Sequence, residues 1–236
     1  MLDQLSTRIF ADGADMDSIL ELALDPRIEG FTTNPTLMRK AGLVGYAEFA
    51  RELLEHIRAH PISFEVFADD TAEIARQAHV IASWGENVYV KIPVTTTSGK
   101  QLAPLVRALS EEGVKVNVTA LFTTAQVEMI TAAVEHGAPS YISVFAGRIA
   151  DAGIDPVPIM AHAVEIIAAA PRSQLIWASP REILNVVQAS EVLCHIITVT
   201  HDLLKKLDCL GKSLEQYSLE TVRMFHGDAM AAGFTL

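Results

Sequence analysis

The alternation of short β-branched runs with longer amphipathic segments constrains the fold of this chain more than any other feature. The runs typical of strands lie at 8–11, 30–33, 62–66, 88–92, 115–118, 141–144, 174–178 and 195–199. Helical patterns lie between them, at 15–24, 46–60, 71–84, 99–112, 124–136, 156–169 and 181–188. Short apolar runs of this kind suit strands that are buried on both faces of a parallel sheet. The sequence therefore predicts repeated strand–helix–strand units.

The number of these units decides between two α/β architectures. Eight strands alternating with helices predict a closed (β/α)8 TIM barrel. An open doubly wound sheet has about five or six strands and often a Gly-rich first turn, whereas the first strand here leads into Ala11-Asp-Gly-Ala-Asp15. We expect one domain over residues 1–236, with an additional amphipathic C-terminal helix at about 214–236. The apolar side chains of that helix must cover either the barrel wall or a neighbouring subunit.

Composition excludes several classes of function. Acidic residues outnumber basic ones by 29 to 18, the net charge is −11, and there is no Lys/Arg run, so we expect no nucleic-acid partner. Two cysteines cannot form a disulfide framework, which favours a reducing compartment. No signal-peptide pattern and no long apolar stretch is present, so we expect a cytoplasmic protein with no membrane partner.

Polar residues follow nearly every predicted strand. In (β/α)8 barrels the C-terminal ends of the strands carry the chemistry. The residues at these ends are Asp12, Thr33, Asn34, Glu65, Lys91, Asn117, Thr119, Ser143, Arg148, Ser179 and Arg181. One amine, two carboxylates, amides, hydroxyls and two guanidinium groups on a single rim predict a functional site.

Lys91 is the most informative of these residues, because it ends an otherwise apolar run. Burial removes the hydration of an ammonium group and favours the neutral, nucleophilic amine. The alternative is a structural lysine whose head group extends to solvent.

Asp12 and Glu65 are candidate proton-transfer groups beside that amine. Asp12 could instead cap the helix that follows it. Glu65 shares the inward face of its strand with Ser63, and an inward carboxylate in a packed barrel needs a partner, which favours a functional role.

Arg148 and Arg181 are candidate ligands for a phosphate group, because the guanidinium group matches phosphate oxygens in pairs and stays charged. Ser179 precedes Arg181 at the end of the seventh strand, where such barrels often bind phosphate. The alternative is that both are ordinary surface arginines near helix starts.

Five sequence blocks carry a resemblance to a known family. They are GFTTNPT at 30–36, EV at 65–66, VKIPVT at 90–95, VNVTALF at 116–122 with Gln126, and ISVFAGRI at 142–149, with a weaker ASPR at 178–181. Together they resemble the transaldolase family of class I aldolases, in particular its small-subunit group, and they span residues 8–199 in the family's order. The resemblance implies transfer of a dihydroxyacetone unit between sugar phosphates in carbohydrate metabolism, as in the pentose phosphate pathway.

The resemblance also implies a role for each site residue. Lys91 would form a Schiff base with the ketose, Asp12 would be the acid/base, and Glu65 and Thr119 would hold the water. The dihydroxyacetone moiety would be bound by Asn34, Asn117, Ser143, Thr33 and Ser63, beside Phe145, and the phosphate by Arg148, Ser179 and Arg181. The family needs no metal and no organic cofactor, and its small members form homo-oligomers, pentamers or decamers.

Two positions separate transfer from simple cleavage. The related fructose-6-phosphate aldolases carry glutamine where this chain has Glu65 and tyrosine where it has Phe145, so these residues favour transfer over release of free dihydroxyacetone. Departures from the family lie at Pro180, after Asp12, and in the hydroxyl-rich loop 95–99. They leave the substrate open, including a sugar with another anion in place of phosphate. A barrel that has lost catalysis is disfavoured, because Lys91 and its neighbours are intact.

Overall fold

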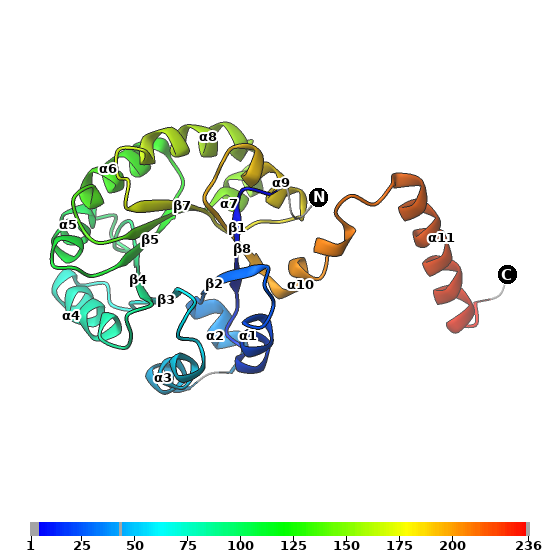
Figure 1. Cartoon of the computed structure of the whole chain (residues 1–236), viewed down its shortest axis with the longest axis horizontal. Helices are drawn as coiled ribbons and strands as arrows, with labels where there is room; N and C mark the ends of the chain where they lie inside the picture. The colour runs from blue at the N-terminus through cyan, green and yellow to red at the C-terminus, as the bar shows by residue number, and fades with distance from the viewer. Residues whose placement is uncertain (1–4, 43, 235–236) are drawn as a thin grey trace.

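The computed structural model describes residues 5–42 and 44–234, and its centre is a closed barrel of eight parallel strands (Figure 1). The strands are β1 Arg8–Asp12, β2 Ile28–Thr32, β3 Ile62–Glu65, β4 Val88–Pro93, β5 Val116–Leu121, β6 Ser140–Val144, β7 Ser173–Trp177 and β8 Ile196–Thr200. Neighbours in sequence pair in order, and β8 pairs with β1 to close the barrel. The predicted (β/α)8 fold is confirmed.

Helices up to residue 191 connect successive strands around the barrel, and the later ones follow β8. They are α1 Met16–Leu22, α2 Pro35–Lys40, α3 Tyr46–His56, α4 Thr71–Ala82, α5 Ala103–Glu111, α6 Thr124–Val134, α7 Ala146–Asp151, α8 Pro156–Ile167, α9 Leu184–Glu191, α10 His201–Leu204, the 3-10 turn η2 Leu207–Cys209 and α11 Leu214–Ala231. The predicted helices are present with shifted ends, whereas α2, α7 and α10 were not predicted. Each of these three is short and follows its strand almost at once, so its pattern is masked by the strand end.

The local sequence explains why α2 begins where it does. The Asn34 side chain accepts a hydrogen bond from the backbone N–H of Leu37 at 3.0 Å. Pro35 occupies the first helical position, where its missing N–H costs no hydrogen bond. The chain therefore turns from β2 directly into a helix at the rim of the barrel.

Aromatic side chains fill the barrel interior below the C-terminal ends of the strands. The Phe10 ring meets the Tyr141 ring edge-on, with centroids 5.7 Å apart, and Tyr141 stacks on Tyr89 at 4.0 Å. A Cβ at Gly30 would lie 2.6 Å from the Phe10 ring, so this position requires glycine. The interior beneath the strand ends is thus a packed core, and the candidate site residues lie on the C-terminal side of it.

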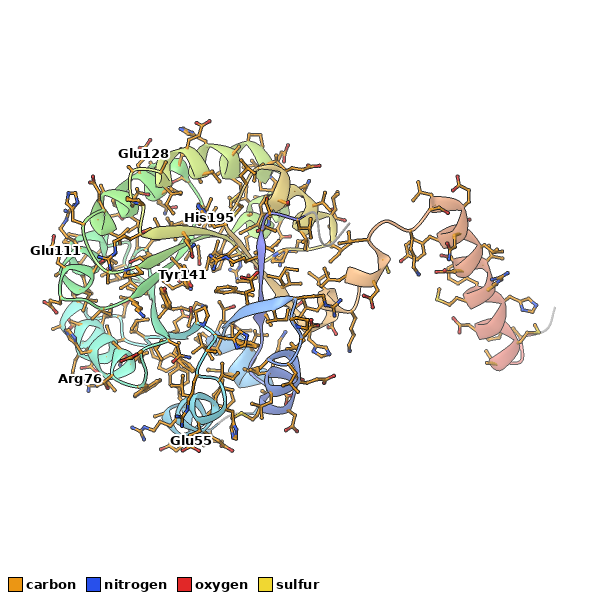
Figure 2. All side chains as sticks on the ribbon, in the orientation of Figure 1. Glu55, Arg76, Glu111, Glu128, Tyr141 and His195 are labelled. Carbon is orange, nitrogen blue, oxygen red and sulfur yellow. The ribbon has the colours of Figure 1, made fainter. Side chains whose placement is uncertain are left out.

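Helix α11 extends away from the barrel, and its side chains stand clear of it (Figures 1 and 2). None of its described residues is buried, although it carries apolar side chains such as Leu219, Val222 and Phe225, the last 64% exposed. The predicted helix at 214–236 is present up to Ala231, and residues 235–236 lie outside the described part. The sequence predicted that these apolar side chains cover either the barrel wall or a neighbouring subunit. In the structure they do not cover the chain's own barrel wall.

Within residues 5–42 and 44–234, no helix is long and apolar enough to cross a membrane.

Candidate active site

A cavity of about 450 Å³ opens at the C-terminal ends of the strands. Most of the predicted site residues line it: Asp12, Asn34, Glu65, Lys91, Asn117, Thr119, Ser143, Phe145, Arg148, Ser179 and Arg181. The barrel therefore brings together side chains from β1, β3, β4, β5 and β6, from helix α7, and from the loops that follow β2, β6 and β7.

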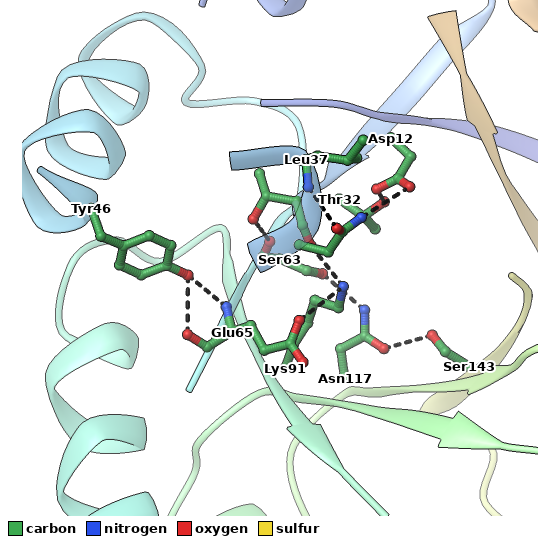
Figure 3. Close-up of polar contacts among 11 residues, drawn as sticks. Asp12, Thr32, Leu37, Tyr46, Ser63, Glu65, Lys91, Asn117 and Ser143 are labelled. Atoms are coloured by element: carbon green, nitrogen blue, oxygen red, sulfur yellow. Dashed lines mark hydrogen bonds and ion pairs between the residues drawn. The ribbon is translucent and has the colours of Figure 1, made fainter. Parts of the chain in front are cut away.

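Lys91 lies inside this cavity near the end of β4 and is only 8% exposed. Its Nζ donates a hydrogen bond to the backbone carbonyl oxygen of Thr33 at 2.6 Å and lies 3.6 Å from Oε2 of Glu65 (Figure 3). A lysine head group that extended to solvent would make neither contact. The amine is held in the barrel interior, where it can reach a molecule that enters the cavity.

Asp12 lies near Lys91, on β1. Its carboxylate accepts hydrogen bonds from Oγ1 of Thr32 at 2.8 Å and Nδ2 of Asn34 at 3.4 Å (Figure 3). Burial raises the pKa of Asp12, and the positive charge of Lys91 and the two hydrogen bonds offset part of that rise. Helix α1 is capped by Asp15, whose side chain accepts from the Ser18 N–H. The carboxylate of Asp12 is thus available to the cavity.

Glu65 ends β3 and is held by a residue that sequence reasoning missed. The Tyr46 hydroxyl accepts a hydrogen bond from the Glu65 N–H at 2.7 Å and lies 3.1 Å from the Glu65 carbonyl oxygen, to which it donates (Figure 3). Burial raises the pKa of Tyr46, so the hydroxyl stays protonated and can make both bonds. No sequence signal marks Tyr46, because its partner lies on a different element.

Asn117 is oriented by a hydrogen-bonded chain across three strands. Its Nδ2 donates to Oγ of Ser63 at 3.0 Å, and its Oδ1 accepts from Oγ of Ser143 at 2.7 Å. Ser63 and Thr33 are fully buried behind the cavity wall, and Thr33 Oγ1 donates to the Ser63 carbonyl oxygen at 2.9 Å. The structure does not bring these two side chains to the cavity surface, although both were predicted to bind substrate.

Thr119 is placed by an irregularity in β5. The pairing of β5 with β6 shifts register between Val118 and Leu121, and Ala120 has a φ of 60°. Such bulges re-aim neighbouring side chains and recur near active sites. Thr119 lines the cavity and is 3% exposed.

The two predicted anion-binding arginines line the cavity from the segments that follow β6 and β7. The guanidinium carbon of Arg148 lies 5.5 Å from the centre of the Phe145 ring. Arg181 is paired with Asp151, whose carboxylate accepts from Nε at 2.9 Å and from Nη2. This pairing was not predicted. It lowers the pKa of Asp151, so a carboxylate stands beside the candidate anion site.

Further cavity-lining residues were missed by sequence reasoning: Thr32, Pro35, Thr36, Leu37, Lys40, Ala178 and Thr198. Several belong to α2, which the sequence did not reveal as a helix. Lys40, at the end of α2, adds a positive charge to the rim of the cavity.

This arrangement suits covalent chemistry at a carbonyl group. A buried amine with two nearby carboxylates can attack a carbonyl and transfer protons, and guanidinium groups at the rim can hold an anionic substrate.

Known proteins resemble this chain over most of its length. A family model described as Transaldolase/Fructose-6-phosphate aldolase matches residues 9–236. A protein of Methanococcus maripaludis named "Probable transaldolase" is 33% identical over 201 residues, covering 85% of this chain and 89% of that protein. A protein of the same name from Thermoanaerobacter sp. is 35% identical over 201 residues, covering 85% and 88%.

A solved structure of a 2,3-dimethylmalate lyase superposes with a TM-score of 0.56 at 14% identity, covering 99% of this chain and 86% of that one. At this identity the likeness concerns the barrel fold alone. The family match and the two sequence relatives go further: the chain is an enzyme of the transaldolase and fructose-6-phosphate aldolase family.

Proposed function

We propose that this enzyme is a transaldolase, which transfers a dihydroxyacetone unit from a ketose phosphate to an aldose phosphate through a Schiff base on Lys91. The observation that carries the proposal is the position of the Lys91 amine, buried in the cavity 3.6 Å from the Glu65 carboxylate and directed by the Thr33 carbonyl. Membership of the family supplies the reaction class.

In the first half of the reaction the amine attacks C2 of the ketose, and loss of water gives an iminium. Asp12 takes the proton of the C4 hydroxyl while the C3–C4 bond breaks, and the electron pair of that bond moves into the iminium to give an enamine. Burial, which raises the pKa of Asp12, makes its carboxylate a stronger base for this step. The shortened aldose then leaves.

In the second half the enamine carbon attacks the carbonyl of an acceptor aldose, and Asp12 returns its proton to the new hydroxyl. Water held by Glu65 and Thr119 then hydrolyses the iminium and frees Lys91. Both residues line the cavity, and Glu65 is the neighbour of Lys91 in the pairing of β3 with β4.

Substrate binding divides between two groups of residues. Asn34, Asn117 and Ser143 bind the hydroxyls of the dihydroxyacetone unit, and the hydrogen bonds of Asn117 to Ser63 and Ser143 keep its amide in one orientation. Arg148, Ser179 and Arg181 bind the phosphate, or another anion at the same end of the sugar.

Phe145 supports transfer rather than release of free dihydroxyacetone. Its ring lines the cavity and packs against Arg148, and it offers no hydroxyl for proton transfer to the enamine. The intermediate therefore persists until an acceptor arrives. Free dihydroxyacetone released as fast as the donor is consumed, with no acceptor added, would identify a cleaving aldolase instead.

Borohydride trapping with fructose 6-phosphate tests the proposal. We expect a reduced dihydroxyacetone adduct by intact mass, mapped to the peptide of Lys91 and lost in Lys91→Met. The matched control is Lys115→Met, since Lys115 donates to the Glu86 carbonyl oxygen away from the cavity. No adduct on the folded enzyme with fructose 6-phosphate, sedoheptulose 7-phosphate or anionic ketoses bearing a sulfonate or carboxylate would overturn the Schiff-base mechanism.

A further inference from the structure

One hydrogen bond that the barrel ladder calls for is absent between β2 and β3. In a parallel pair, alternate residues of one strand donate to and accept from the other strand at even spacing. Here the Phe31 N–H donates to the Pro61 carbonyl oxygen at 2.9 Å, and the Thr33 N–H donates to the Ser63 carbonyl oxygen at 3.2 Å. The next bond in this series would run from the Glu65 N–H to the Thr33 carbonyl oxygen.

Both groups of that missing bond have other partners. The Glu65 N–H donates to the Tyr46 hydroxyl at 2.7 Å, and the Thr33 carbonyl oxygen accepts from Lys91 Nζ at 2.6 Å. The Tyr46 hydroxyl also donates to the Glu65 carbonyl oxygen at 3.1 Å, so one side chain binds both backbone groups of Glu65 (Figure 3). The hydrogen-bond ladder between β2 and β3 is therefore interrupted at the carbonyl oxygen that accepts from the Lys91 amine.

The Tyr46 ring is fixed by its packing. It contacts Phe67 with ring centroids 4.5 Å apart, Trp84 at 5.8 Å and Phe64 at 6.2 Å. Tyr46 is the first residue of α3, so the aromatic cluster and the helix together set the height of the hydroxyl against β3. The hydroxyl is thus a rigid donor and acceptor rather than a mobile surface group.

We propose that Tyr46 is a positioning residue for the Schiff-base reaction. Because the Tyr46 hydroxyl accepts the hydrogen bond of the Glu65 N–H, the Thr33 carbonyl oxygen is left to accept from the Lys91 amine and orient it. The same hydroxyl fixes the position of the end of β3, from which the Glu65 carboxylate faces that amine. Tyr46 acts through these groups and does not itself touch the substrate. The inference rests on the proposed function of Lys91.

Removal of the hydroxyl has a definite structural consequence. In Tyr46→Phe the Glu65 N–H loses its partner in a part-buried position, and the nearest acceptor along the ladder is the Thr33 carbonyl oxygen, which already accepts from Lys91. When the Glu65 N–H donates to this oxygen, it competes with Lys91 Nζ for the same acceptor. The new hydrogen bond also rotates the end of β3. Both partners of the reaction, the amine and the carboxylate, are then displaced.

The test is single-turnover borohydride trapping together with steady-state kinetics on Tyr46→Phe. We expect the trapping rate and kcat to fall about 10- to 100-fold, the cost of a displacement of about 1 Å in a reacting group. The donor KM should change by less than about twofold, because the anion-binding residues on α7 and after β7 are untouched.

Two controls separate the hydroxyl from general packing. Tyr141→Phe removes a buried hydroxyl from the aromatic layer beneath the cavity, and Phe67→Leu loosens the ring contact while the Tyr46 hydroxyl stays. Tyr141→Phe should keep a trapping rate close to that of the unchanged enzyme, and Phe67→Leu, which keeps the hydroxyl, should lose less than Tyr46→Phe. Equal rates for Tyr46→Phe and the unchanged enzyme would overturn the inference, as would an equal loss in Tyr141→Phe.

Amide hydrogen exchange on the unchanged enzyme gives an independent reading should Tyr46→Phe fold poorly. The Glu65 amide should be protected to the same degree as the ladder amides of Phe31 and Thr33, and exchange at the rate of a loop amide would contradict the inference. If the unchanged enzyme forms no adduct at Lys91, the proposed function fails. If it does and Tyr46→Phe traps as fast, only the inference about Tyr46 fails.

Discussion

Arg181 donates hydrogen bonds to both carboxylate oxygens of Asp151, at 2.9 Å and 3.1 Å from its Nε alone, at the rim of the candidate active site. The family resemblance assigns Arg181 to the substrate anion, yet here its guanidinium faces a carboxylate of the same chain. A substrate phosphate that binds Arg181 must therefore share the guanidinium group with the Asp151 carboxylate or displace that carboxylate.

We therefore expect Asp151→Asn to strengthen binding of a phosphorylated donor. The KM should fall about two- to fivefold, the factor that corresponds to an exposed ion pair of up to about 1 kcal/mol, while kcat changes little. Steady-state kinetics at low and high salt measure the effect, which salt should diminish. Glu128→Gln removes the same charge from the outer face of α6 and is the control. A higher KM in Asp151→Asn would show that Asp151 instead orients Arg181 for the anion.

A second expectation concerns stability and pH at Asp12. Its pKa is raised in the folded enzyme, so the folded state binds this proton more tightly than the unfolded state. The charged carboxylate then destabilises the fold above that raised pKa, and the penalty disappears as the pH falls toward 4. Asp12→Asn should unfold at a higher temperature than the unchanged enzyme at pH 7 to 8, with a difference that shrinks at lower pH, although catalysis is lost.

Asp69 provides a control of opposite sign. Hydrogen bonds from Thr97 lower the pKa of Asp69, so its charge stabilises the fold above the ordinary carboxyl pKa. Asp69→Asn should lower the unfolding temperature at neutral pH, again with a difference that shrinks in acid. Thermal unfolding between pH 4 and 8 checks both variants, and parallel behaviour of the two would contradict the assignment of burial as the dominant cause at Asp12.

A third expectation follows from the close approach of α7 to the loop after β7. A Cβ at Gly147 would lie 1.6 Å from the Ser179 carbonyl oxygen, and Ser179 itself has a φ of 64°. Gly147→Ala should cost about 1–3 kcal/mol of unfolding free energy, as overpacking does, and should raise the donor KM by displacing Ser179. Chemical denaturation measures the first effect. Gly227→Ala on α11, with open space around it, should be neutral or slightly stabilising.

A fourth expectation concerns α11. We propose that its apolar side covers a neighbouring copy of the chain, because Leu219, Val222 and Phe225 are spaced for one side of the helix and are exposed in the single chain. Sedimentation should give a mass well above the 25.6 kDa of one chain. Val222→Glu with Phe225→Glu should shift it to that of one chain, while Gly227→Glu with Ala231→Glu, on the opposite side of the helix, should not. A mass of about 26 kDa for the unchanged protein would refute assembly.

Much of the fold and site could be predicted from the sequence because the signals are local. Short apolar runs define the strands, and a lysine at the end of such a run, as at Lys91, is conspicuous whatever surrounds it. Most polar residues at predicted strand ends line the cavity, since closure of a parallel barrel places all these ends on one rim.

What could not be predicted depends on contacts between elements. Tyr46 reaches Glu65 from a helix nineteen residues earlier, and Asp151 reaches Arg181 from thirty residues away. Neither pair has a spacing rule, because each depends on how a helix sits on the barrel. Thr33 binds the Lys91 amine through its backbone carbonyl oxygen. Every residue has this atom, so the residue type at position 33 could not predict the contact.

The aromatic floor formed by Phe10, Tyr89 and Tyr141 has a kinetic consequence. In the described part of the chain the barrel interior beneath the cavity is filled, so in the proposed transfer reaction the departing aldose and the incoming acceptor use the same opening and compete for the arginines proposed to bind the anion. The two aldoses cannot occupy the site together. Double-reciprocal plots at several acceptor concentrations should give parallel lines, and the aldose released from the donor should inhibit competitively against the acceptor.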